Sequence, residues 1–214
     1  MKIGILGSGT VGQTLAAGFL KHGHTVMLGT RNPQKPEVQK WLQATPGAMA
    51  GTFQETAQFG EFLVLATGGN VVAEAIALAG PANFTGKTVM DATNPISGAP
   101  VGGILPFFTG PNESLAERIQ ALLPQAHVVK AFNSVGAARM VNPSYQQGKP
   151  TMFYCGDNDA AKGSVRAIIE QFGWQPYDCG GIVAARAIEP LCMLWCSRGF
   201  QHNQWDHAFA LLTA

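Results

Sequence analysis

Short apolar runs alternate with longer stretches of helical periodicity along most of the chain. The clearest run, residues 61–67, predicts a buried strand that leads into Gly68, Gly69 and Asn70. Strands alternating with helices indicate a mostly parallel sheet that binds its ligands at the carboxyl ends of the strands. Further strands are expected at residues 3–6, 24–29, 48–52, 87–91, 127–133, 151–155 and 175–179, and helices at 11–20, 36–42, 71–78, 114–123, 160–172 and 184–195.

The first strand ends in a glycine turn, Gly7-Ser8-Gly9-Thr10-Val11-Gly12, that leads directly into a helix. In such a turn Gly7 permits the tight bend, Gly9 lets a pyrophosphate approach, and Gly12 lets the helix pack on the strand. The helix N-terminus offers unpaired N–H groups and a positive dipole end to phosphates. A turn that binds nothing is the alternative, but strand, glycine turn and helix in this order favour a dinucleotide site.

The predicted fold class is therefore α/β, with a Rossmann-type doubly wound, mostly parallel sheet and a small C-terminal α/β lobe. We expect residues 1–145 to form the dinucleotide-binding Rossmann domain. Residues 146–214 should form a strand–helix–strand–helix lobe packed on it.

The end of the second predicted strand indicates which dinucleotide binds. An NAD site carries an acid there, about 20 residues after the glycines, to hold the ribose 2′-OH. This chain instead has Thr30, Arg31 and Asn32, with Lys35 close behind and no acid. A hydroxyl, a guanidinium and an ammonium group suit a 2′-phosphate. A solvated basic loop is the alternative, but the distance from the glycine turn favours NADP(H).

Two other strand ends supply candidate cofactor residues. Ala66, Thr67 and Gly68 follow one strand, where the glycines either admit a ligand or simply form a turn. Asn94 and Pro95 end the next strand and are candidates to face the nicotinamide.

Residues 97–112 are rich in glycine and proline yet include apolar side chains between Ile104 and Phe108. A stretch of this length without regular structure is often a functional lid, and apolar residues on it suit a flat ligand or a partner subunit. A loop folded back onto its own core is the equal alternative.

The composition limits the kinds of partner that we expect this protein to have. The net charge is +1 and the 14 basic residues are scattered, so nothing indicates a nucleic-acid footprint. The sequence has no run of 18 apolar residues, so no membrane span is predicted, and the first strand is too short for a signal-peptide core. We expect a cytoplasmic protein.

No metal site is predicted. His202 and His207 flank Trp205 without a ligand spacing, which favours surface positions. Buried reduced thiols are favoured over metal ligands for the four cysteines, Cys155, Cys179, Cys192 and Cys196, because they form no C-x-x-C pair.

The last helix is apolar nearly all round, which indicates a core position or a homodimer contact. Its Arg186 and Glu189 are expected to pair across the helix surface.

A set of motifs resembles NADPH-dependent deazaflavin-coenzyme (coenzyme F-420 type) oxidoreductases across essentially the whole chain. The same set is similar to the NADPH-binding domain of STEAP metalloreductases. Besides the glycine turn, these motifs are Gly29-Thr30-Arg31-Asn32-Pro33, Asp91-Ala92-Thr93-Asn94-Pro95, Val129-Lys130-Ala131-Phe132-Asn133, Cys155-Gly156-Asp157 and Glu189-Pro190-Leu191.

The resemblance implies a Rossmann domain with a small C-terminal lobe, and a deazaflavin, FAD or FMN packed against the nicotinamide between them. It places Thr10 and Val11 at the pyrophosphate, and Thr30, Arg31 and Lys35 at the 2′-phosphate. Two departures concern the acceptor side: the archaeal enzymes have a histidine in place of Asn133 and a Pro-Trp-like pair in place of Gly68-Gly69. Near the nicotinamide and the acceptor the resemblance places Ala131, Asn133 and Gly136.

The expected function is hydride transfer between NADP(H) and a flavin or deazaflavin-type small-molecule acceptor, with positioning in place of catalytic side chains. A reductase of small carbonyls or imines is one alternative, with Lys130 as the general acid beside Asn133. Alternation along a strand should place these two side chains on opposite faces, which disfavours that alternative. A non-catalytic NADPH-sensing module is the other alternative.

Overall fold

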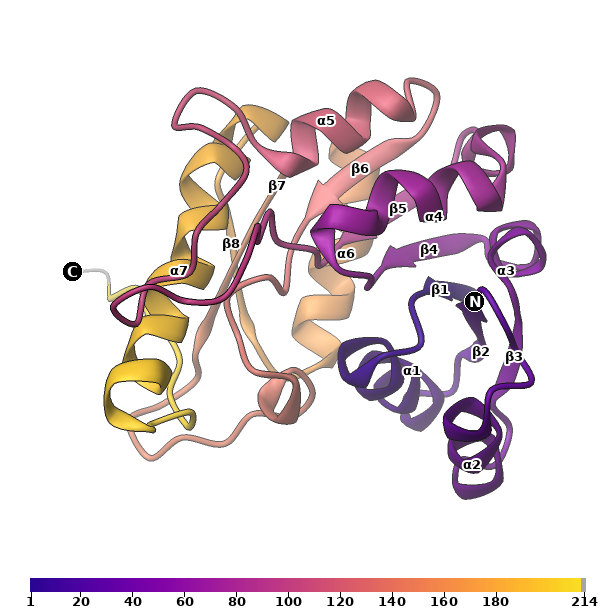
Figure 1. The fold of residues 1–214 in the computed structure, drawn as a ribbon, viewed down its shortest axis with the longest axis horizontal. Helices are drawn as coiled ribbons and strands as arrows, with labels where there is room; N and C mark the ends of the chain where they lie inside the picture. Colours follow the sequence, from indigo (N-terminus) through magenta and orange to yellow (C-terminus); the bar gives the residue numbers. More distant parts are fainter. Residues whose placement is uncertain (213–214) are drawn as a thin grey trace.

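Residues 1–212 of the computed structural model are described. They contain one eight-stranded sheet in the order β3-β2-β1-β4-β5-β6-β7-β8 (Figure 1). Neighbouring strands are parallel except β6 and β7, which are antiparallel. The α/β fold class with a doubly wound, mostly parallel sheet is thus confirmed. The strands are β1 (Lys2–Leu6), β2 (Thr25–Thr30), β3 (Met49–Thr52), β4 (Phe62–Leu65), β5 (Thr88–Asp91), β6 (His127–Lys130), β7 (Thr151–Gly156) and β8 (Gln175–Asp178).

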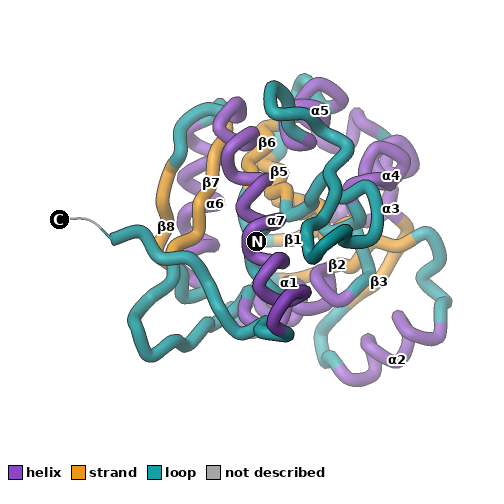
Figure 2. Tube along the Cα trace, turned by 60° about the vertical axis from the view of Figure 1, so that its left-hand side comes forward, coloured by secondary structure: helices purple, strands orange, loops and turns teal. Residues whose placement is uncertain are grey.

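Helices cover both faces of the sheet (Figure 2). On one face α1 and α6 pack around Phe19, Ile168 and Trp174, and on the other α3, α4 and α5 pack around Phe53, Ile76 and Ile119. Both faces therefore exclude water from the parallel strands, as such a sheet requires. The helices are α1 (Thr10–Lys21), α2 (Pro36–Ala44), α3 (Phe53–Phe59), α4 (Val72–Ala79), α5 (Leu115–Leu122), α6 (Asp159–Gln171) and α7 (Ala185–His202), with short 3₁₀ turns η1 (Gly69–Val71), η2 (Pro81–Phe84), η3 (Ala137–Arg139) and η4 (Ile182–Ala184).

Helix α3 is an element that the periodicity did not predict. Its signal is a capping box, in which the Thr52 hydroxyl accepts from the Glu55 N–H and the Glu55 carboxylate accepts from the Thr52 N–H. The helix is too short for a periodic apolar pattern, so only its cap marks it.

The strand expected at residues 127–133 ends early. Strand β6 stops at Lys130, because Phe132 has a left-handed backbone conformation with φ of 60°. The alternation predicted for Lys130 and Asn133 is therefore wrong, since strand geometry does not extend to Asn133. The consequence for the site is described below.

The C-terminal strands continue the sheet of the N-terminal part. Strand β7 pairs with β6, and Trp174 and Phe172 belong to the same core as Phe19. Whether residues 146–214 form a lobe of their own stays a prediction. No helix within residues 1–212 has the length and apolar character needed to cross a membrane.

Candidate functional site

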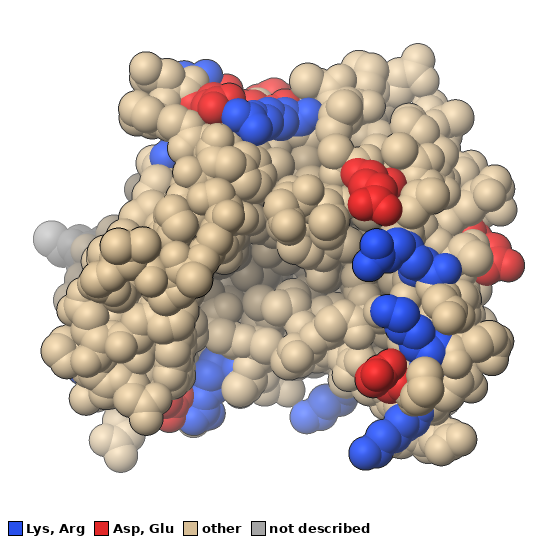
Figure 3. Space-filling view, in the orientation of Figure 1, with Lys and Arg blue, Asp and Glu red and all other residues tan. Residues whose placement is uncertain are grey.

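Two adjoining cavities form a groove at the carboxyl ends of β1, β2, β4 and β5. The first has a volume of about 200 Å³ and lies beside the glycine turn and the end of β2. The second has a volume of about 470 Å³ and lies beside the end of β5 and Ser97. Ala66, Thr67 and Gly68 line both cavities and so connect them. Figure 3 shows the hollowed face that carries this groove.

The glycine turn has the geometry that a bound pyrophosphate requires. Gly7 has φ of +133°, and a Cβ at Gly12 would lie 1.9 Å from the Gly7 carbonyl oxygen, so both positions need glycine for the fold itself. A Cβ at Gly9 would meet no protein atom within 4 Å. Protein packing therefore does not demand this glycine, and the space beside it is open to a ligand. Gly9 is also the N-cap of α1 and leaves the N-terminus of that helix without a side-chain cap.

The end of β2 supplies the polar groups of the first cavity. Thr30, Arg31 and Lys35 line it together with Gly7, Ser8 and Gly9. Lys and Arg side chains gather on the same side of the hollow (Figure 3). Glu74 of α4 lines the cavity as well, and its carboxylate lies 3.8 Å from the Arg31 guanidinium. The sequence did not point to this acid, because it lies on a different element from the β2 loop.

The junction of the cavities is built without large side chains. The Thr67 hydroxyl oxygen is buried and has no hydrogen-bond partner among the described residues. A Cβ at Gly69 would lie 2.0 Å from the Asn94 carbonyl oxygen, so glycine is required there for close packing. At Gly68 a Cβ would meet only the side-chain end of Asn70, at 2.8 Å, within the described chain. Gly68 lines both cavities, so its lack of a side chain leaves room where they meet.

At the end of β5 the second cavity is lined by Thr93 and by the amide of Asn94. Its Nδ2 donates to the Asn133 carbonyl oxygen at 2.8 Å, and its Oδ1 accepts from Asn133 Nδ2 at 3.2 Å. Asn133 is buried behind Asn94 and also donates to the Ile188 carbonyl oxygen of α7 at 3.1 Å. Because β6 ends early, Asn133 points toward α7 and lies behind the groove. It contacts Asn94, which lines the second cavity.

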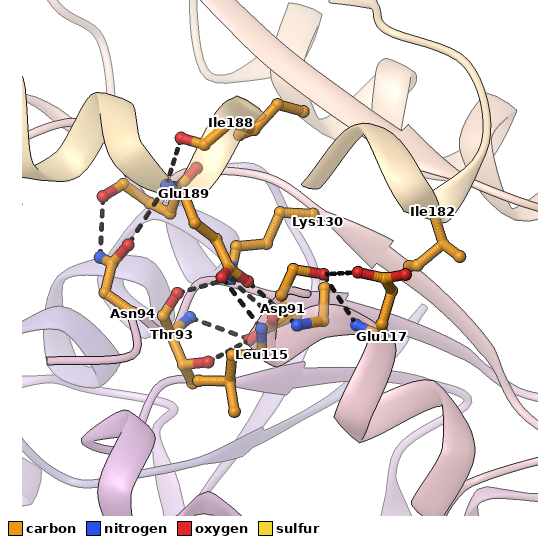
Figure 4. A network of polar contacts seen from close by, with 12 residues as sticks. Asp91, Thr93, Asn94, Leu115, Glu117, Lys130, Ile182, Ile188 and Glu189 are labelled. Atoms are coloured by element: carbon orange, nitrogen blue, oxygen red, sulfur yellow. Dashed lines mark hydrogen bonds and ion pairs between the residues drawn. The ribbon is translucent and has the colours of Figure 1, made fainter. Parts of the chain in front are cut away.

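Lys130, a fully buried lysine, lies near Asn94 between Asp91 and Glu189 (Figure 4). Lys130 Nζ contacts Asp91 Oδ2 at 2.8 Å and Glu189 Oε1 at 3.2 Å, and it also donates to the Thr93 carbonyl oxygen. Burial alone would lower the pKa of Lys130, but the charges of Asp91 and Glu189 outweigh burial and raise this pKa above its ordinary value. Lys130 is therefore a charged lysine at neutral pH, with an acceptor for each of its three N–H donors.

Glu189 corrects an expectation about the last helix. It does not pair with Arg186; its carboxylate is buried and accepts from the backbone N–H groups of Leu115 and Ala116, at 2.9 and 3.0 Å. Arg186 instead donates to Glu117 of α5 on the surface. Sequence spacing within one helix could not reveal partners that come from α5 and β6.

Several predicted cofactor residues do not line the two cavities. Val11 lines the second cavity, whereas Ala131 is fully buried. Gly12 lies outside both linings because it packs against Gly7. The predicted residues outside both linings are Thr10, Gly12, Asn32, Pro95, Ala131 and Asn133.

The thiols lie away from the groove lining. All four cysteines are free; Cys155 and Cys192 are buried as expected, whereas Cys179 and Cys196 are half-buried. Burial raises the pKa of the Cys155 thiol to about 12, which keeps it protonated and unreactive. Within residues 1–212 no cluster of three or more His, Cys, Asp and Glu side chains could hold a metal ion.

Two expectations about the surface change. His207 is half-buried, with its ring stacked on Trp195 at a centroid distance of 4.8 Å, so its predicted surface position is wrong. Helix α7 buries Ile188, Cys192 and Trp195 but exposes Leu194. The homodimer stays a prediction.

The loop of residues 97–112 follows β5 and runs beside α7 (Figure 1). Ser97 and Gly98 line the second cavity, and Phe107 faces Pro190 and Met193 of α7 across a smaller cavity. The loop thus folds back onto the protein, in part over the C-terminal helix. This corresponds to the second of the two alternatives, a loop folded back onto its own core.

Comparison with known proteins shows which family the chain resembles. Residues 2–95 match the family described as NADP oxidoreductase, coenzyme F420-dependent. The crystal structure of a protein from Arthrobacter sp. FB24, named as a candidate F420-dependent NADP-reductase, covers 100% of both chains with a TM-score of 0.93 and 32% identity.

Two further relatives are informative. Metalloreductase STEAP3 of Rattus norvegicus is 30% identical over 192 residues, which are 89% of this chain and 36% of STEAP3. The chain thus spans about a third of the length of that relative. An imine reductase from Streptomyces aurantiacus matches 91% of this chain and 61% of its own with a TM-score of 0.66, and at 18% identity this likeness shows the fold alone.

Proposed function

Since this chain belongs to the family of coenzyme F420-dependent NADP oxidoreductases and is itself an NADP-dependent oxidoreductase, we propose that it passes a hydride between NADP(H) and the ring of a flavin or deazaflavin. The observation that carries the proposal is the pair of connected cavities, which differ in character. One has basic and hydroxyl groups suited to a phosphate, and the other is larger and is lined by Thr93 and Asn94 at the end of β5.

The chain's own residues fit NADP(H). Gly9 and the uncapped N-terminus of α1 would hold the pyrophosphate, because N–H groups and open space occur there together. Thr30, Arg31 and Lys35 would hold the 2′-phosphate. The unpartnered Thr67 hydroxyl supplies a further polar contact between the two ends. When bound, the cofactor supplies the hydride, and these residues bind and orient it.

The second cavity has room for an acceptor ring beside the cofactor. Its volume of about 470 Å³ lies within the usual range of about 300–1,000 Å³ for ligand sites. The absence of a side chain at Gly68 leaves room where the two cavities meet. Hydride transfer between two rings depends mainly on their placement, so the site needs no general acid.

The test is anaerobic stopped-flow measurement of NADPH oxidation with coenzyme F420, FMN or FAD as the acceptor, repeated with NADH. We expect at least one of these rings to be reduced, with NADPH strongly preferred over NADH. Failure of all three acceptors with a protein that binds NADPH tightly would overturn the proposal and favour an NADPH-sensing module.

The carbonyl or imine reductase alternative requires an accessible acid, and the chain does not provide one at Lys130. That side chain is 0% exposed, and its three N–H donors already have acceptors. A reductase of that kind would lose turnover but keep NADPH binding in Lys130→Ala. Turnover of imines by the unaltered protein, measured as NADPH consumption, would revive this alternative.

A further inference from the structure

A closed ring of contacts connects the ends of β5 and β6 to α7 (Figure 4). On one side Lys130 holds the Thr93 carbonyl oxygen, and Asp91 Oδ1 accepts from both the N–H and the hydroxyl of Thr93 at 2.9 and 2.7 Å. The backbone conformation just before Asn94 is therefore fixed by buried polar contacts. Thr93 and Asn94 both line the second cavity, and Asn94 is the one that bonds to Asn133.

The other side of the ring runs through α7. Asn133 donates to the Ile188 carbonyl oxygen, and the next residue, Glu189, contacts Lys130 at 3.2 Å. The ring thus returns to its starting point, and each link is buried or half-buried. Glu189 also caps the N-terminus of α5 through the N–H groups of Leu115 and Ala116, which fixes the carboxylate from a third direction.

We propose that Lys130 and Glu189 are positioning residues, whose ion pair sets the orientation of the Asn94 amide at the hydride-transfer end of the groove. This inference rests on the proposed function for the role of the second cavity. Neither Lys130 nor Glu189 lines either cavity of the groove, so both act through Asn94. The ring is rigid because the ammonium group has only three N–H donors and all three are engaged.

A purely stabilising role explains this arrangement less well. Buried ion pairs lose most of their Coulomb energy to desolvation, and well-packed apolar groups often serve stability equally well. Two carboxylates around one ammonium also leave an excess negative charge, which backbone N–H groups of α5 and Thr93 must offset. The gain is geometric, because three charges at fixed distances locate β5, β6 and α7 relative to one another. A displacement of about 1 Å at such a position can reduce a transfer rate about 100-fold.

The test compares Glu189→Gln with a matched control, Arg186→Gln. Glutamine keeps the size of Glu189 but removes its charge, which loosens the contact with Lys130. Arg186→Gln breaks the surface pair with Glu117, which joins the same two helices without belonging to the ring. For each variant we would measure the NADPH dissociation constant, the fluorescence lifetime of the bound nicotinamide, and the single-turnover rate of NADPH oxidation.

We expect Glu189→Gln to keep NADPH affinity within about twofold, to shorten the nicotinamide lifetime, and to slow single-turnover transfer about 10-fold to 100-fold. Arg186→Gln should match the unaltered protein in all three. An unchanged lifetime and rate in Glu189→Gln would overturn the inference. If the unaltered protein transfers hydride to no acceptor, the proposed function fails, while the lifetime comparison still decides the inference.

Asn133→Ser provides a second variant should Glu189→Gln fail to fold. It removes the contacts with Asn94 Oδ1 and the Ile188 carbonyl oxygen but leaves the three buried charges paired. We expect the same shortened lifetime and slower transfer. A variant that folds and keeps both at the values of the unaltered protein would equally overturn the inference.

Discussion

Replacement of Arg31 by alanine should weaken NADPH binding while leaving NADH binding nearly unchanged. A hydrogen bond to a charged group contributes about 1.5–3 kcal/mol. The Arg31 side chain is 66% exposed, so solvent screens its charge, and it already lies 3.8 Å from Glu74. An exposed pair of this kind contributes at most about 1 kcal/mol, so its loss on binding costs little. We therefore expect the lower part of the range, about 1.5–2 kcal/mol, or about 12-fold to 30-fold in affinity.

The assay is a fluorescence titration with NADPH and NADH at two salt concentrations. The NADPH affinity of the unaltered protein should fall with salt, because screening weakens contacts between exposed charges. Lys40→Ala is a suitable control, because Lys40 is an exposed cation of α2 that lines neither cavity of the groove. Equal weakening of NADPH and NADH binding in Arg31→Ala would refute the assignment of the 2′-phosphate to this end of the groove.

Three further outcomes are expected. Gly12→Ala should destabilise the protein by about 3 kcal/mol or more in urea melts, because the added Cβ would overlap the Gly7 carbonyl oxygen. Gly9→Ala should instead keep full stability and weaken NADPH binding in the titration, because its Cβ would meet no protein atom within 4 Å. Cys155, whose pKa is raised by burial to about 12, should react with a thiol reagent at neutral pH only after denaturation, and rapid reaction in the folded protein would contradict this. The pKa of Lys130 is raised in the folded state, so the contribution of Lys130 to the free energy of unfolding should persist up to about pH 10.4 and decline as pH rises further. Urea melts across this range test this, and a loss of that contribution already near pH 8 would contradict the buried ion pair.

That the glycine turn and the loop after β2 line one cavity could be predicted, because these residues lie close together in the sequence. The turn from Gly7 to Gly12 and the loop from Thr30 to Lys35 are local motifs with fixed spacing. Their positions follow from one strand, one helix and the next strand, which the periodicity of apolar residues predicts well. Glu74 escaped prediction because it comes to the same cavity from α4.

The buried contacts behind the second cavity could be predicted only in fragments. The motifs around Asp91, Lys130 and Glu189 each carried part of the family resemblance, but nothing in their sequences showed that they meet. Strand periodicity even placed Lys130 and Asn133 on opposite faces, because the left-handed backbone at Phe132 has no signal in the apolar pattern. Tertiary contacts decide such positions, and a single sequence does not contain them.

This difference indicates how the two halves of the groove can change. Under the proposed function, coenzyme choice would depend on one short loop after β2, where Thr30 is buried and Arg31 and Lys35 are exposed, so we expect a few substitutions there to alter it. The second cavity, which we propose for the acceptor, depends on the packing of β5, β6, α7 and the loop of residues 97–112 around Asn94. Gly69 packs against the Asn94 carbonyl oxygen, so a larger side chain there would displace the amide that lines this cavity. A change of acceptor therefore requires coordinated changes in elements far apart in the sequence, whereas a change of coenzyme does not.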